Sequence, residues 1–118
     1  MPSIDYFKNI DETITLDAGS IVFDQGDQGD EMYAIREGEI EIQFNGNILA
    51  TLSAGEIFGE MALIDTTIRS AKAIAKSDCV LVPIDKQRFL FLVHETPTFA
   101  LQVMRTMADR MRAMHRMI

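Results

Sequence analysis

The residues best suited to chemistry lie within one short stretch, which contains Gly59, Glu60 and Arg69. Good helix formers follow Gly59, and they predict a short helix whose first N–H groups lack internal partners and favour an anion. Gly59 lets a ligand approach the backbone closely, and the guanidinium of Arg69 matches two phosphate oxygens at once. A carboxylate would repel a phosphate, so Glu60 is better suited to accept a hydrogen bond from a sugar hydroxyl. The stretch predicts a ligand with one phosphate and one sugar hydroxyl; the alternative is an ordinary Arg–Glu pair in a surface turn.

Residues 58–71 closely resemble the phosphate-binding cassette of cyclic-nucleotide-binding domains. That cassette reads F-G-E-[aliphatic]-A-L-[aliphatic], then a few variable residues, then R-[small]-A, and residues 58–64 and 69–71 match it. The resemblance implies a β-roll that binds cAMP or cGMP. It places the ligand-binding residues at Phe58, Gly59, Glu60, Met61, Ala62, Arg69, Ser70 and Ala71.

The resemblance also implies a role for individual positions of the cassette. Gly59 and Ala62 would offer backbone N–H groups to the ligand, and Glu60 would accept from the ribose 2′-hydroxyl. Arg69 would pair with the cyclic phosphate, and Ser70 would add a hydroxyl near the phosphate or the base. The cassette therefore assigns the phosphate and the ribose to separate side chains.

The base of the ligand is less well defined by the sequence. A small hydroxyl residue after the arginine occurs in family members that bind cAMP and in members that bind cGMP. Ser70 therefore does not distinguish between the two ligands. In many members the last helix covers the base, and the candidates here include Met104, Arg105 and Met107. The overall likeness of the cassette favours cAMP over cGMP, and Met61 is expected to pack beneath the cassette.

The elements that must position these residues are mostly strands. Short apolar or alternating runs end at glycine turns, and Asn45-Gly46 is a strong hairpin signal. This pattern predicts a mainly β fold with C-terminal helices, a double-stranded β-helix or jelly roll. The turn glycines are expected to shape the roll without touching the ligand: Gly19, Gly26, Gly29, Gly38 and Gly55. The strands are expected near 14–16, 21–23, 32–35, 39–44, 48–52, 70–75 and 79–84.

Two helices are expected after the roll. Asp85 can cap a helix over about 86–95, and Thr96-Pro97 is a good start for a helix over about 97–117. A further short helix is possible around 4–7. At 118 residues the chain is expected to be a single domain over 1–118, with the β-roll over about 12–84.

The last helix carries an apolar heptad pattern. Its a and d positions are Ala100, Met104, Met107, Met111, Met114 and Ile118, while Leu101, Val103 and Ala108 flank them. The flanking residues are expected to pack on the roll. The pattern favours a homodimer through the 100–118 helix; the alternative is that the same stripe packs on the chain's own roll.

Composition limits the partners. The net charge is −7, with −10 in residues 1–96 and +3 in residues 97–118, so direct binding to nucleic acid is not expected. The sequence has no signal-peptide pattern and no apolar run long enough to cross a bilayer, so no membrane contact is expected. A single cysteine, Cys79, suits the reducing cytoplasm.

The sequence does not favour an enzyme. His94 and His115 have no neighbours at metal-ligand spacing, and the acidic loop 24–31 lacks the spaced oxygen ligands of a calcium loop. No metal and no cofactor are therefore expected, and the ligand is a cyclic nucleotide. The chain is expected to sense that ligand by movement of its C-terminal helices and to act on a separate effector protein. The alternative is a ligand-free interaction or dimerisation adaptor on the same fold.

Overall fold

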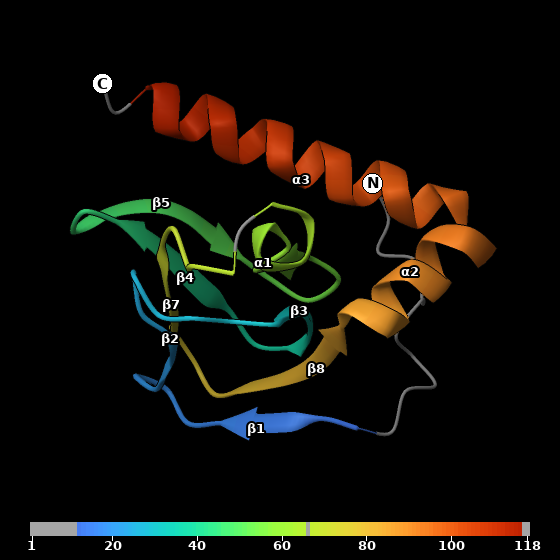
Figure 1. Ribbon diagram of the computed structural model, residues 1–118. Helices are drawn as coiled ribbons and strands as arrows, with labels where there is room; N and C mark the ends of the chain where they lie inside the picture. Colours follow the sequence, from blue (N-terminus) through green and yellow to red (C-terminus); the bar gives the residue numbers. More distant parts are fainter. Residues whose placement is uncertain (1–11, 66, 117–118) are drawn as a thin grey trace.

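The computed structural model describes residues 12–65 and 67–116, which form two antiparallel sheets and three helices (Figure 1). Each sheet has four strands. The first sheet joins, in order, β1 (Ile14–Leu16), β8 (Cys79–Asp85), β3 (Glu31–Glu37) and β6 (Ile57–Phe58). The second joins β2 (Ile21–Phe23), β7 (Lys72–Ala75), β4 (Ile40–Phe44) and β5 (Asn47–Leu52). The predicted mainly β fold with C-terminal helices is confirmed.

The β4–β5 hairpin shows how local sequence sets the register. Asn45 and Gly46 both have positive φ, 51° and 81°, as a two-residue hairpin turn requires. Ile40 and Ile42 alternate with polar residues in β4 and are buried between the sheets. The roll therefore closes around an apolar interior, and the segment after β6 follows directly from the buried strand β6.

The three helices follow the expected order along the chain. They are α1 (Met61–Ile64), α2 (Lys86–Glu95) and α3 (Pro97–His115). The Asp85 carboxylate accepts a hydrogen bond from the backbone N–H of Arg88 at 2.8 Å, as expected for the α2 cap. Thr96 occupies the N-cap position of α3, but its side chain makes no capping bond. The helix expected around 4–7 lies outside the described residues.

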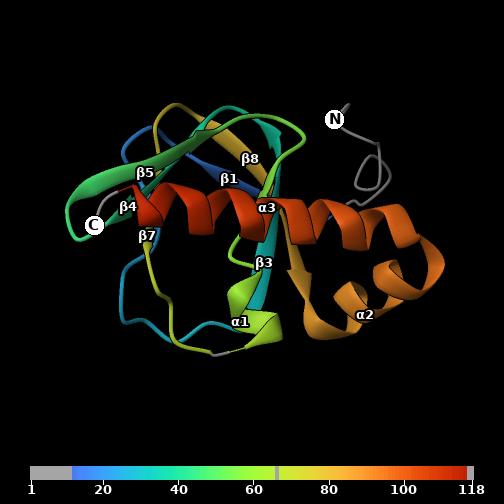
Figure 2. The same cartoon turned by 90° about the horizontal axis from the view of Figure 1, so that it is seen from above.

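Helix α3 crosses the roll, with α2 beside its beginning (Figure 2). Phe99 and Val103 are buried against the roll, and the Phe99 ring meets the Phe89 ring of α2 edge to face at 5.9 Å. This anchoring fixes the rotation of α3. Met107 is consequently turned toward the chain's own core.

The predicted division of the α3 faces was partly wrong. Val103 packs on the roll as expected, but Leu101 is exposed, and the expected seam residue Met107 lies on the roll-facing side. The exposed apolar residues Leu101, Met104 and Met111 form a different stripe. The seam position Ile118 lies outside the described residues.

Among the described residues, no helix is both long enough and apolar enough to span a membrane.

Candidate functional site

A cavity of about 280 Å³ lies between the segment after β6, the second sheet and α3. Seven of the eight predicted site residues line it: Gly59, Glu60, Met61, Ala62, Arg69, Ser70 and Ala71. Phe58 does not. Its ring is fully buried in the core, where it stacks on Tyr33 at 5.4 Å between ring centroids. Met61, which was expected to pack beneath the cassette, is on the cavity wall.

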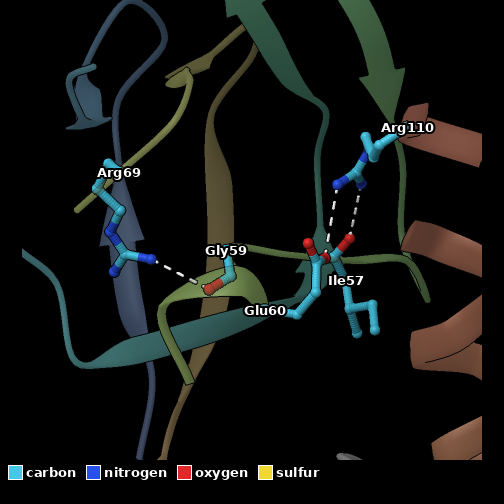
Figure 3. A network of polar contacts seen from close by, with 5 residues as sticks. All are labelled: Ile57, Gly59, Glu60, Arg69 and Arg110. Atoms are coloured by element: carbon cyan, nitrogen blue, oxygen red, sulfur yellow. Dashed lines mark hydrogen bonds and ion pairs between the residues drawn. The ribbon is translucent and has the colours of Figure 1, made fainter. Parts of the chain in front are cut away.

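Arg69 is buried at the cavity wall, with a relative exposure of 5%. Its Nη1 donates to the carbonyl oxygen of Gly59 at 3.1 Å (Figure 3), and its Nη2 donates to that of Glu31 at 2.7 Å. The guanidinium carbon lies 4.1 Å from the ring centroid of Phe23, a cation–π contact. Nε has no hydrogen-bond partner. Burial lowers the pKa of Arg69, although an arginine stays charged. The side chain is therefore a cation held in place through Nη1 and Nη2, with a buried Nε that has no acceptor.

The acidic loop after β2 forms a ladder with the segment that carries Arg69. The N–H of Arg69 donates to the carbonyl of Asp27 at 2.7 Å, and the N–H of Gly26 donates to the carbonyl of Arg69 at 2.8 Å. Gly29 lies directly over the guanidinium: a Cβ at this position would stand 2.1 Å from Nε. The expectation that the turn glycines do not touch the ligand stays a prediction, but Gly29 lies against the guanidinium that is expected to bind it.

Glu60 is buried on the other side of α1, with a relative exposure of 3%. Arg110 of α3 places Nη1 3.5 Å from its Oε1 and donates through Nη2 to the carbonyl of Ile57 at 3.0 Å. Figure 3 shows Arg69 and Arg110 on opposite sides of the Gly59–Glu60 segment. Glu60 Oε1 has no hydrogen-bond partner. Burial raises the pKa of Glu60, and the Arg110 charge opposes this effect. Burying the charged carboxylate therefore costs desolvation free energy, and a further hydrogen-bond donor would reduce that cost.

Helix α1 is shorter than an anion site built on a helix dipole requires. It has four residues, and the N–H of Ala62 already donates to the carbonyl of Gly59 at 3.3 Å. Gly59 has φ +80°, a conformation that favours glycine. The positive charge at this wall therefore comes mainly from Arg69, and the expected role of the Ala62 N–H is weakened.

Sequence reasoning missed the rest of the cavity wall. From the sheets and from α3 it includes Phe23, Ile42, Phe44, Leu49, Arg110, Met111 and Met114. Of the three expected base-covering residues, Met107 lines the cavity, whereas Met104 and Arg105 do not. The signal for this wall is the spacing of Met107, Met111 and Met114 on one helix, which also fits the predicted dimer seam.

Metal binding has no support in the described part of the chain, where no three His, Cys, Asp or Glu side chains come together as ligands.

The structure is a β-roll with a buried arginine on a cavity under its last helix, and residues 13–96 match the family model described as "Cyclic nucleotide-binding domain". This chain belongs to the cyclic nucleotide-binding domain family. It is 44% identical over 79 residues to the cAMP-dependent protein kinase regulatory subunit of Schizosaccharomyces pombe. The matched region covers 66% of this chain and 19% of that protein.

Two further comparisons bear on the ligand. The cyclic AMP receptor protein of Thermus thermophilus is 34% identical over 100 residues, covering 80% of this chain and 46% of that protein. A solved structure titled as the cGMP-bound form of the EAL enzyme Bd1971 is 34% identical with a TM-score of 0.68, covering 89% of this chain and 29% of that chain. The chain spans less than half the length of the first curated relatives that it matches.

Proposed function

We propose that the cavity binds a cyclic purine mononucleotide, with cAMP ahead of cGMP, and that the domain senses this ligand. Two curated relatives, 44% and 34% identical, are named for cAMP, and a 34% identical structure is titled as cGMP-bound. The cavity volume of about 280 Å³ lies just below the usual range of ligand sites, roughly 300–1,000 Å³. This size favours a mononucleotide over a dinucleotide.

The observation that carries the proposal is a pair of buried polar atoms without hydrogen-bond partners, on two residues that line one cavity. Arg69 Nε is a donor without an acceptor, and Glu60 Oε1 is an acceptor without a hydrogen-bond donor. Each such group costs about 1–3 kcal/mol when buried. A ligand that brings a phosphate oxygen and a ribose hydroxyl would satisfy both atoms. This pairing of one anion with one hydroxyl matches the chemistry expected from the cassette.

Helix α3 is the proposed readout. Arg110 connects α3 to the cassette through the Glu60 carboxylate and to strand β6 through the Ile57 carbonyl. A ribose hydroxyl that donates to Glu60 would change the balance of this ion pair. A ligand can shift an equilibrium only by its differential affinity for the two arrangements, and Arg110 supplies a contact through which that difference would reach α3.

The proposed homodimer uses a seam revised from the structure. Leu101, Met104, Ala108 and Met111 are spaced by three and four residues along α3, and all but Ala108 are exposed. Met111 also lines the cavity. A second copy seated on this stripe would therefore contact a residue of the ligand site.

The proposed role is binding without catalysis, with the output passed to a separate effector in the cytoplasm. Both histidines of α2 and α3, His94 and His115, are exposed and lie off the cavity wall. Cys79, the only cysteine of the chain, is buried as a free thiol, in keeping with a reducing compartment.

Titration calorimetry with cAMP tests the function. The parent protein should bind at one site, and the ligand should raise its melting temperature because it binds only the folded state. Arg69→Ala should weaken binding by about tenfold to a few hundredfold, from a charge-assisted bond of about 1.5–3 kcal/mol. Arg69→Lys keeps the charge and controls for misfolding. If neither cAMP nor cGMP gives binding heat or a thermal shift, the ligand-free adaptor replaces the sensor.

A further inference from the structure

The wall that α3 presents to the cavity is made largely of methionine. Met107, Met111 and Met114 line it at positions i, i+4 and i+7, together with Arg110. Arg110 is already engaged by the Glu60 carboxylate and the Ile57 carbonyl. The α3 wall therefore offers thioether groups to a ligand, with its one charged group occupied elsewhere.

The sheet side of the cavity is also apolar. Its lining includes Ile42 and Phe44 of β4 and Leu49 of β5. Four lining residues have polar side chains: Glu60, Arg69, Ser70 and Arg110. If Arg69 takes the phosphate and Glu60 takes the ribose, as the proposed function holds, Ser70 alone is left among them to read the edge of a base.

We infer that Met107, Met111 and Met114 hold the base by apolar contact with its face, so that the site discriminates only weakly between adenine and guanine. This inference rests on the proposed function and concerns its specificity. Methionine adapts its shape, and its sulfur contacts aromatic rings without reading the donors and acceptors on their edges. Met111 is 69% exposed, so this part of the wall is open to water in the single chain.

The expected size of the discrimination follows from the kind of contact. A site that hydrogen-bonds the group distinguishing two ligands can reject the wrong one by about 10⁴–10⁵-fold, whereas apolar pockets discriminate by roughly 10–200-fold. With the same phosphate and ribose on both ligands, the affinities of cAMP and cGMP should differ by less than about a hundredfold. A cyclic pyrimidine nucleotide, which has one ring fewer to bury, should bind more weakly than either.

Calorimetric competition among cAMP, cGMP and cyclic CMP tests the inference. Met111→Ala and Met114→Ala should weaken both purine ligands by the same factor, about three- to tenfold, and leave their ratio unchanged. Met104→Ala is the matched control, because Met104 is an exposed methionine of the same helix that does not line the cavity. Circular dichroism checks that each variant stays folded.

The outcomes separate the inference from the function on which it rests. A cAMP to cGMP ratio above a hundredfold in the parent protein would overturn the inference and leave the sensor function intact. A methionine variant that weakens only one purine would also overturn it. Absence of binding by all three nucleotides would overturn the proposed function and the inference together. Methyl NMR provides a second readout: both purines should shift the Met111 and Met114 methyl signals by ring currents, and by more than they shift the Met104 signal.

Discussion

The methyl group added by a Gly29→Ala substitution would fall inside the guanidinium of Arg69. Its Cβ would lie 2.1 Å from Nε, 2.3 Å from Cζ and 2.4 Å from Nη2, whereas ordinary contacts begin near 3.4 Å. Gly29 is outside the positive-φ region, so its backbone accepts alanine. The guanidinium must therefore retreat by about 1.3 Å, which misaligns it with a bound phosphate and strains its 2.7 Å bond to the Glu31 carbonyl.

The loss should approach that of one charge-assisted hydrogen bond, about 1.5–3 kcal/mol. This corresponds to roughly 10- to 150-fold weaker binding of cAMP. Titration calorimetry measures the affinity, and thermal melting without ligand measures the stability. We expect a large change in the affinity for cAMP and a small change in the melting temperature.

Gly26→Ala is the matched control for the loop. Gly26 has φ +93°, and an added Cβ would meet no atom within 4 Å. This variant should lower the melting temperature through backbone strain and keep most of the affinity. If Gly29→Ala stays folded and binds cAMP as tightly as the parent, or if it only matches Gly26→Ala in both measurements, the positioning of Arg69 by Gly29 is refuted.

Three further predictions concern other residues. In Glu60→Gln, stability should depend less on pH. Burial raises the pKa of Glu60 above its ordinary 4.5, so the folded state binds this proton more tightly than the unfolded state. The contribution of Glu60 to stability is then greatest below that ordinary value, and it falls as pH rises through the raised pKa. Urea unfolding between about pH 5 and about pH 7.5 checks this, and a parent and variant with equal slopes would contradict it. The same variant should bind cAMP more weakly by about 1 kcal/mol, because a carboxylate acceptor becomes a neutral amide acceptor. Calorimetry would show unchanged affinity if Glu60 does not meet the ribose. Met104→Glu should abolish the proposed dimer, since it buries a charge in the Leu101–Met111 stripe. Analytical ultracentrifugation measures the oligomeric state of parent and variant, and a parent that is monomeric at every concentration would contradict the proposed seam.

The strands and the cassette could be predicted because their signals are local. Alternation in β4, the Asn45-Gly46 turn and the glycine before Glu60 each follow from a few neighbouring residues. The two-residue strand β6 was missed, because its pairing with β3 is a tertiary contact with no periodicity of its own. Its consequence is that Phe58, expected at the ligand, belongs to the core.

The rotation of α3 could not be predicted from its sequence. Methionines at heptad spacing fit a dimer seam and a cavity wall equally well, and the choice depends on where Phe99 and Val103 anchor the helix. No local signal distinguishes Arg110 from the other arginines of α3. Its contact with Glu60, about fifty positions away in sequence, exists only in the folded chain. The position of Gly29 against the Arg69 guanidinium could not be predicted either, because a glycine in a loop is already explained by the turn.

The Nε–H signal of Arg69 in nitrogen-resolved NMR gives the most direct test of the site. This donor is buried and has no acceptor in the structure. On titration with cAMP the signal should move downfield, as expected when a phosphate oxygen accepts its hydrogen bond, and the backbone amides of residues 59–62 should shift with it. An Arg69 signal that stays in place at saturating cAMP would contradict the account.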